Sequence, residues 1–557
     1  MQTGISRTRL RRISKMRRAR ARHAKIPFRD GNFVAALVCA GAFVAAMALA
    51  FLSKCRPGPC MAGAQCGGFT LLMLGTDAAV LAASMAVVRI LLGMLAPEIA
   101  ARNSRLLLLA ILGVAGDALA VGAFRLAGRL WPLLLPGSPD GFPQLSPFLA
   151  PTLFAPVAAT LLAGPGAGVS LGVGMAVQSI LVVPREAALP VVLVSLAAAV
   201  AGPPAAARVK DRGGLFRLFL CGGALQLLLM LCSVPPFASG IGEALRAPDG
   251  PQPALLAFSL ALGCAAAIAV LPSYVATAAT LPVFEHVFAA CSNLRLARFA
   301  DLRTPLLERL AIDAPGTYHH SLLVANLASA AAERIGANAL LCLVGGYYHD
   351  VGKLSNPANF TENHSPGDTN PHDSLPPNLS AIILASHVKD GIGQALDNNL
   401  PAPVRQIIRE HHGTSKMAFF LAKARDLAAA KAAETGSQPE PVDENQFRYP
   451  GPRPSSVESA IVSIADSVEA ASRSLDRPSP AAIEKLVDGI VSAKAADGQF
   501  DESPLTYAEV ADLRRAFASA LATVRHARIA YPDADKDAKP DANAGNTAPD
   551  AKQQPAR

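Results

Sequence analysis

Long apolar stretches dominate the first half of the chain. A membrane hydrocarbon core about 30 Å thick needs roughly twenty apolar helical residues to cross it. Eight stretches of that kind occur, at 33–52, 69–95, 105–131, 147–164, 166–183, 187–205, 214–235 and 254–282. The run Gly164-Pro165-Gly166 and similar Pro and Gly residues leave the boundaries of the fourth to sixth loose, so seven or nine spans are alternatives. We therefore expect a polytopic helical membrane domain.

From about residue 283 the pattern changes to the shorter period of amphipathic helices. Segments Ser321–Ile335, Leu379–His387 and Val404–His411 carry apolar residues at helical spacing, and no run alternates as a half-buried strand would. The composition of residues 431–446 predicts an inserted loop, and that of 533–557 predicts a disordered tail. The expected fold is thus all-α: a helical membrane domain followed by an all-helical soluble domain.

Composition and charge agree with a membrane protein. The chain has 557 residues, a mean hydropathy of +0.32 and only 17% charged residues, which is too apolar for an ordinary soluble protein. The net charge is +9, but the basic residues crowd into the first thirty positions, from Arg7 to Arg29. That placement indicates a cytoplasmic membrane flank rather than a nucleic-acid groove. The expected partner is a lipid bilayer and not a nucleic-acid polymer.

The basic flank also sets the predicted orientation, because Lys and Arg are retained on the cytoplasmic side. With an even number of crossings, both ends lie in the cytoplasm of a multi-pass protein of the inner (plasma) membrane. A cleavable signal peptide within residues 1–52 is the competing interpretation, but the apolar run exceeds the typical signal core of about 7–15 residues. A disulfide among Cys55, Cys60 and Cys66 is left open.

The predicted organisation follows from these boundaries. It comprises a basic N-terminus (1–31), a first transmembrane helix (32–52), a short extracytoplasmic loop (53–68), a seven-transmembrane region (69–282), a connector (283–313), a soluble domain (314–532) and a tail (533–557).

Histidine and aspartate side chains concentrate in the soluble part, and nine of the eleven histidines lie after residue 300. A lone histidine is more often a capping or surface residue, but here several occur in pairs or beside aspartate. Imidazoles and carboxylates together suit first-row transition metals, and one carboxylate can bridge two ions. The set therefore predicts a metal site, and its members are His319-His320, His349-Asp350, His387, His411-His412 and Asp466.

The motifs around these residues resemble the HD hydrolase domain attached to seven-transmembrane receptors, over about residues 281–532. The segments that carry the resemblance are Ala314–Ser321, Tyr347–Lys353, Phe360–Asn363, Asn370–Asp373, His387–Gly391, His411–Thr414 and Phe447–Pro452. Residues 497–503 also resemble the family, but the sequence assigns them no role. One departure is the short loop 53–68, where the family usually carries a large extracytoplasmic domain.

The resemblance implies a phosphodiesterase that opens cyclic di-AMP to linear pApA with two divalent transition-metal ions, iron or manganese. One ion would be bound by His320, His349, Asp350 and Asp466, and the other by Asp350, His387, His411 and His412, with Asp350 as the bridge. The second histidine of the pair His319-His320 is the one that matches the family ligand. Asp350 and Lys353 are the expected catalytic residues, and the expected substrate contacts are His319, Lys353, Asn359, Phe360 and Asn363.

Alternatives remain for several of these assignments. Lys353 lies one helical turn after Asp350, where it could hold a phosphate, but a surface lysine is the alternative; Phe360 could equally serve packing. An HD enzyme for cyclic di-GMP would normally show Gly-Tyr-Pro after the histidine pair, whereas Gly413-Thr414 follows it here. A membrane receptor that binds a nucleotide without cutting it is a further alternative, and a homodimer is left open.

Overall fold

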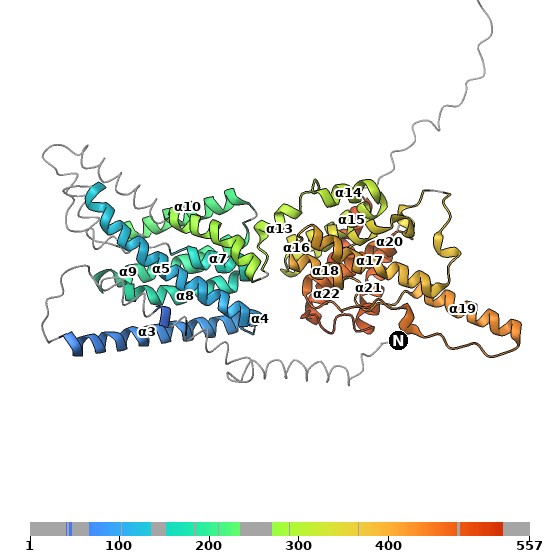
Figure 1. Cartoon of the computed structure of the whole chain (residues 1–557), viewed down its shortest axis with the longest axis horizontal. Helices are drawn as coiled ribbons and strands as arrows, with labels where there is room; N and C mark the ends of the chain where they lie inside the picture. The colour runs from blue at the N-terminus through green and yellow to red at the C-terminus, as the bar shows by residue number, and fades with distance from the viewer. Residues whose placement is uncertain are drawn as a thin grey trace, which may run out of the picture.

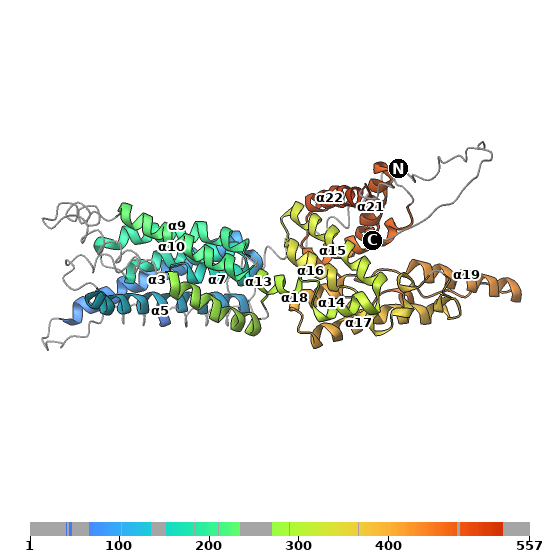
Figure 2. The ribbon, with the colours of Figure 1, turned by 90° about the horizontal axis from the view of Figure 1, so that it is seen from above.

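The computed structural model describes residues 41, 44–46, 66–101, 103–134, 152–182, 185–209, 211–233, 270–288, 290–365, 367–475 and 479–526. Within these ranges the regular structure is helical, and the only extended pairing is an isolated antiparallel bridge between Lys416 and Arg448. The all-α prediction is thus confirmed. Figure 1 shows two groups of helices, α3 to α10 and α14 to α22, with α13 between them, and Figure 2 shows the same arrangement from above.

The first group contains the predicted membrane helices. Three stretches in the described ranges are long and apolar enough to cross a membrane: Gly75–Leu95, Asn103–Ala123 and Arg212–Leu229. They belong to three of the predicted spans. The helices of the group are α3 (Cys66–Leu95), α4 (Pro97–Ala100), α5 (Asn103–Leu134), α7 (Phe154–Ala163), α8 (Pro165–Val182), α9 (Arg185–Ala207) and α10 (Arg212–Ser233), followed by helical residues 270–287.

Helices α7, α8 and α9 carry shorter apolar stretches of 10–17 residues. Helix α7 is buried along its whole length from Phe154 to Leu162, so it is the central helix of the apolar cluster. It ends at Gly164, whose φ of +92° only glycine adopts readily, and Pro165 starts α8 at once. The predicted span 33–52 lies outside the described residues apart from 41 and 44–46, and the count of eight crossings stays a prediction.

The second group contains the helices of the domain that the sequence predicts to be soluble. The predicted segments Ser321–Ile335, Leu379–His387 and Val404–His411 fall in α15, α17 and α18, with His411 as the residue that ends α18. The helices are α13 (Asn293–Phe299), α14 (Pro305–Asp313), α15 (Pro315–Ile335), α16 (Ala339–Tyr348), α17 (Pro377–Asp397), α18 (Ala402–Glu410), α19 (Ala418–Thr435), α20 (Val457–Ser472), α21 (Pro480–Ala496) and α22 (Tyr507–His526), with short 3₁₀ turns η2 (Val351–Ser355), η3 (Pro357–Asn359), η4 (Thr361–Asn363), η5 (Pro371–Asp373) and η6 (Glu444–Phe447).

One predicted loop begins too early. The loop predicted for 431–446 begins later, because α19 continues to Thr435 and ends at Gly436, which has a left-handed φ of +64°. Helix-forming alanine and lysine fill residues 428–432, so the first effective stop is the glycine. The last helix of the first group continues to residue 287, and the end of the membrane region at 282 stays a prediction.

Helix α15 lies at the centre of the second group, where it packs against α16, α20 and α22. Apolar clusters cover it on two sides. One contains Val324, Leu327 and Ala328 with residues of α20, α21 and α22, and the other contains Ala325 with residues of α14, α16 and α18. This packing fixes the helices whose polar side chains meet between them.

Helix α13 joins the two groups and contacts both. Leu294 packs against the apolar cluster of the first group, whereas Leu296 is buried in a cluster of the second. Ser292 caps the helix by accepting a hydrogen bond from Arg295 N (3.2 Å), and its own hydroxyl donates to Glu285 at the end of helical residues 270–287. The junction is therefore held by packing on both sides and by a hydrogen-bonded cap.

Candidate metal centre

Seven histidine and aspartate side chains meet where several helices end. They come from five places in the fold: His320 from α15, His349 and Asp350 from the junction of α16 and η2, His387 from α17, His411 and His412 from the end of α18, and Asp466 from α20. Their ligand atoms form two groups, Asp350 with His387, His411 and His412, and His320 with His349 and Asp466; within each group the atoms lie within 4.8 Å of one another.

Asp350 stands between the two groups and offers one carboxylate oxygen to each. Its Oδ2 lies 3.5 Å from Nε2 of His320 and 3.2 Å from Nε2 of His349. Its Oδ1 lies 3.3 Å from Nε2 of His387 and 3.6 Å from Nε2 of His411. A carboxylate in that position can bridge two metal ions.

Asp466 makes a second link across the centre. Its Oδ1 lies 3.2 Å from Nε2 of His320, and its Oδ2 lies 3.5 Å from Nδ1 of His412. Both aspartates are almost fully buried, with exposed fractions of 1% for Asp350 and 8% for Asp466. Buried carboxylates need a cation or strong donors to offset their desolvation.

In four histidines Nδ1 is hydrogen-bonded to a group outside the centre, and this bond turns Nε2 of the ring toward the centre. His320 Nδ1 bonds to Oε2 of Glu469 (2.5 Å), and Glu469 is also paired with Arg473 at 2.9 Å. The other three donate from Nδ1 to the backbone oxygen three residues earlier: His349 to Gly346 (2.8 Å), His387 to Leu384 (2.6 Å) and His411 to Ile408 (2.8 Å). Such bonds fix the tautomer and leave Nε2 with a free lone pair, as in metal-binding histidines.

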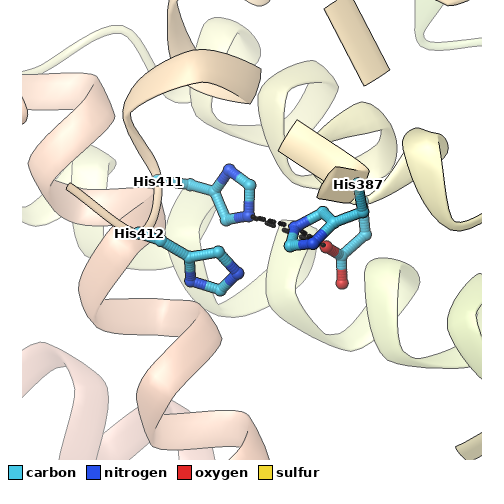
Figure 3. Close-up of side chains that lie close together, drawn as sticks. His387, His411 and His412 are labelled. Atoms are coloured by element: carbon cyan, nitrogen blue, oxygen red, sulfur yellow. Dashed lines mark hydrogen bonds and ion pairs between the residues drawn. The ribbon is translucent and has the colours of Figure 1, made fainter. Parts of the chain in front are cut away.

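This arrangement fits a bound cation better than a set of hydrogen bonds. Nε2 of His387 and Nε2 of His411 lie 3.3 Å apart (Figure 3), yet both are acceptors once the Nδ1 atoms carry the protons. Nε2 of His349 and Oδ1 of Asp350 are buried and make no hydrogen bond. Several lone pairs thus converge without a donor, and divalent metal ions bound by N and O ligands remove that conflict.

The pKa shifts of the aspartates and histidines show how charge is distributed in the centre. Burial would raise the pKa of Asp350 and Asp466, but the neighbouring cations and donors outweigh it and hold both pKa values well below the ordinary range. Burial lowers the pKa of His387 to about 4 and that of His412 well below its usual value, so both rings are neutral at pH 7 and able to coordinate. Burial also opposes charge on His349, but Asp350 and Asp466 raise its pKa to about 10. The carboxylates therefore stabilise positive charge at the centre.

Lys353 lies at the edge of the centre with its ammonium fully engaged. Nζ donates to Oδ2 of Asp350 (2.9 Å) and to Oε1 of Glu362 (2.6 Å), and it lies 5.0 Å from the ring centroid of Phe360. The turn that carries Lys353 approaches α17 closely, because a Cβ on Gly352 would lie 1.9 Å from the backbone oxygen of His387. Glycine is required there by the close contact.

The residues predicted to touch the substrate lie at different distances from the centre. Phe360 is buried with its ring edge-on to His387 at 5.9 Å, so it forms the wall of the centre with Lys353. Asn363 is held by Thr317, whose N–H donates to Oδ1 at 3.0 Å, and the backbone oxygen of Asn359 accepts a bond from His372 at 2.9 Å. His319 is exposed and belongs to neither group of ligand atoms. Their contact with a substrate stays a prediction.

Sequence reasoning missed three residues at the centre. Glu469 follows Asp466 by three positions on α20, a spacing that places both on one helix face and could have been recognised. Glu362 and Tyr449 lie within quoted motifs but received no role. Tyr449 stacks on His412 with ring centroids 4.0 Å apart and an interplanar angle of 26°.

The fold and the centre define a helical domain with a cluster of potential metal ligands, and a family model matches the same part of the chain. Residues 317–471 match the family model described as HD domain, so the second group of helices carries an HD domain. Two curated relatives have the name cyclic-di-AMP phosphodiesterase PgpH. The one from Bacillus subtilis is 46% identical over 259 residues, which are 46% of this chain and 35% of that protein.

The second relative, from Listeria monocytogenes, is 43% identical over 257 residues, which are 46% of this chain and 34% of that protein. This chain therefore covers about a third of the length of the curated relatives it matches. A crystal structure of the L. monocytogenes PgpH HD domain matches with 42% identity and a TM-score of 0.37, covering 40% of this chain and 100% of that one. A crystal structure of the same domain in complex with cyclic-di-AMP gives the same identity and TM-score. Over this region the sequence of the chain is similar to that of the two PgpH proteins.

Proposed function

We propose that this protein is a membrane-bound, metal-dependent phosphodiesterase that hydrolyses cyclic di-AMP to linear pApA. The observation that carries the proposal is Asp350, whose two oxygens each face a separate group of histidine nitrogens. The names of the two relatives that are 46% and 43% identical over this region support the substrate.

The proposed ligands divide as the two groups do, with Asp350 shared. His320, His349 and Asp466 complete one site, and the other contains His387 with the pair 411–412. When bound, two divalent ions, iron or manganese, would acidify a shared water and neutralise the phosphodiester oxygens during in-line displacement. A P–O ester bond breaks as the water oxygen bonds to phosphorus, so no protein nucleophile is needed.

The residues of the chain orient this chemistry. Lys353 holds Asp350 through its 2.9 Å bond and places a positive charge beside the centre, where it opposes the negative charge of a phosphodiester. Glu469 fixes the ring of His320. The buried ring of Phe360 limits water on the side of His387.

The test uses the full chain purified in detergent. With Mn²⁺, cyclic di-AMP should be converted to pApA, and Asp350→Asn should be inactive in the same preparation. We expect kcat/KM for cyclic di-AMP to exceed that for cyclic di-GMP by about a hundredfold, a ratio that needs roughly 2.7 kcal/mol of differential binding. Equal rates on the two dinucleotides would contradict adenine selection, and preference for a phosphomonoester would overturn the cyclic-dinucleotide assignment.

We also propose that the HD domain lies in the cytoplasm and that the membrane helices regulate it. The first group of helices is linked to the centre by two asparagines: Nδ2 of Asn293 donates to the backbone oxygen of Ala207 at the end of α9 (3.0 Å), and Nδ2 of Asn338 donates to Oδ1 of Asn293 (3.3 Å). Asn338 caps α16, whose other end carries His349. Movement of α9 would thus reach the helix that positions a metal ligand.

Two measurements test this part of the proposal. A reporter fused after residue 532 should be active only in its cytoplasmic form, and periplasmic activity would exclude the proposed topology. Asn293→Ala should change turnover of the full chain in a bilayer while leaving its metal content unchanged. Turnover equal to that of the unmodified chain, in bilayers of several lipid compositions, would contradict a regulatory link through α13.

A further inference from the structure

Two neighbouring histidines, His411 and His412, direct their rings to one centre, with centroids 4.0 Å apart. Successive side chains of a helix point about 100° apart, so two of them cannot both face one point unless the chain leaves the helix there. Helix α18 does end at this place: His411 still bonds to Ile407 O, while Gly413 N closes a turn onto Glu410 O at 2.8 Å. The position of His412 therefore depends on what holds that turn.

Gln499 holds the turn from outside, although it lies far away in the sequence. Its Oε1 accepts the backbone N–H of Thr414 (3.0 Å), and its Nε2 donates to Oγ1 of the same threonine (3.0 Å). The side chain is almost completely buried, with 1% exposed. The amide also packs against Gly413, where a Cβ would lie 2.3 Å from Oε1 and where φ is +54°. The glycine makes room for the amide and adopts the left-handed conformation that the turn needs.

Two charged residues lock Gln499 in this orientation. Nε2 donates a second bond to Oδ2 of Asp497 (2.7 Å), so both amide protons and the amide oxygen are bonded. Asp497 is paired with Arg448 at 2.9 Å, and Arg448 donates to the backbone oxygen of Thr414 at 2.6 Å. Both peptide groups of Thr414 are thereby fixed, one by Gln499 and the other by Arg448.

We propose that Gln499 is a positioning residue for the metal ion bound by His387, His411 and His412. Residues 497–499 hold the turn of Gly413 and Thr414, and this turn directs the ring of His412 toward the centre. The inference rests on the proposed metal site. Without the amide, the turn of Gly413 and Thr414 relaxes toward a continued helix, and the ring of His412 moves away from the centre. The group His320, His349 and Asp466 approaches this turn only where Oδ2 of Asp466 lies 3.5 Å from Nδ1 of His412, so we expect it to retain its ion.

The test is a metal count on the full chain in detergent, without substrate. Gln499→Leu removes every hydrogen bond of the amide at similar volume, and exposed Gln438→Leu is the matched control. We expect the unmodified chain and the control to bind two Mn²⁺ ions and to give the electron paramagnetic resonance signal of an exchange-coupled pair. We expect Gln499→Leu to lose one ion, with at least about a tenfold weaker affinity, and to give the signal of isolated Mn²⁺. A coupled pair of unchanged affinity in Gln499→Leu would overturn the proposal.

A second variant guards against simple loss of folding. Gln499→Glu alone places a carboxylate against Asp497 and should weaken binding of the ion held by His387, His411 and His412. Gln499→Glu combined with Asp497→Asn exchanges the amide and the carboxylate and should restore the coupled pair. Failure of the exchange to restore it, with helical content by circular dichroism intact, would count against the inference. If all variants behave as expected but cyclic di-AMP is not cut by the unmodified chain, the proposed function fails while the positioning role of Gln499 stands.

Discussion

Replacing Glu469 with glutamine should weaken one metal site by a calculable amount. Glu469 is buried on α20, and its carboxylate bonds to Nδ1 of His320 at 2.5 Å. Glutamine keeps the size and the acceptor oxygen but removes the charge. The substitution therefore tests whether a charged partner behind His320 contributes to metal binding, without opening a cavity.

The expected magnitude follows from the strength of the bond that changes. A hydrogen bond to a charged group contributes about 1.5–3 kcal/mol and a neutral one about 0.5–1.5 kcal/mol, so the exchange costs about 1–1.5 kcal/mol. A difference of about 1.4 kcal/mol is tenfold in affinity. We expect the ion bound by His320, His349 and Asp466 to bind about five- to tenfold more weakly in Glu469→Gln. Arg473, which pairs with Glu469, is 44% exposed and can be hydrated, so its loss of a partner adds little.

Calorimetric titration of the metal-free full chain with Mn²⁺ measures this change. Glu444→Gln is the matched control, because Glu444 is paired with Lys416 and Arg425 on the surface and has no contact with the centre. The affinities of the control should equal those of the unmodified chain. If Glu469→Gln binds both ions as tightly as the control does, the charge of Glu469 does not support His320 and the reasoning is refuted.

Three further substitutions test other parts of the structure. Asp350→Asn should release both ions and reduce turnover by orders of magnitude; elemental analysis that still finds two ions, with activity, would show that the site is wrong. Gly352→Ala should lower the free energy of unfolding by about 3 kcal/mol in denaturant titration, because its Cβ would meet a backbone oxygen of α17, whereas Gly393→Ala, with open space around it, should not destabilise. Burial raises the pKa of Asp497, but the bond from Arg448 outweighs it and lowers the pKa below 3.8. The stability lost in Asp497→Asn should therefore be fully visible above about pH 5 and vanish as the pH falls through the folded pKa; a difference constant down to pH 2 would contradict this.

Residue type and spacing predicted an all-helical domain, three of its helical segments and a set of candidate ligands. The structure brings His320, His387 and His411 together from the helices of those segments, whereas His349 and Asp466 come from α16 and α20, which the sequence did not single out. Their function as ligands stays a prediction. The choice of His320 over His319 came from the family motif, and the structure places only His320 beside Asp350.

What could not be predicted depends on contacts between distant segments. Gln499 and Thr414 are 85 positions apart, and no local pattern indicates that a loop after α21 fixes the end of α18. Tyr449 was visible as a motif residue, but its stacking on His412 arises only from packing. In the first group, α7 is a buried helix of ten residues, although the hydropathy of 147–164 resembles that of a span. Hydropathy reports burial and cannot distinguish burial in protein from burial in lipid.

The double contact of α13 determines where a catalytic fragment should begin. A fragment starting at residue 301 would remove Leu296, which is 1% exposed, and Phe299, whose ring packs edge-on against Tyr348 at 6.4 Å, directly before the ligand His349. A fragment starting at Ser292 keeps both and retains the cap of the helix. In this fragment Leu294 is exposed to solvent, because the first group of helices that covers it in the whole chain is missing. Leu294→Gln would therefore replace an exposed apolar side chain with a polar one.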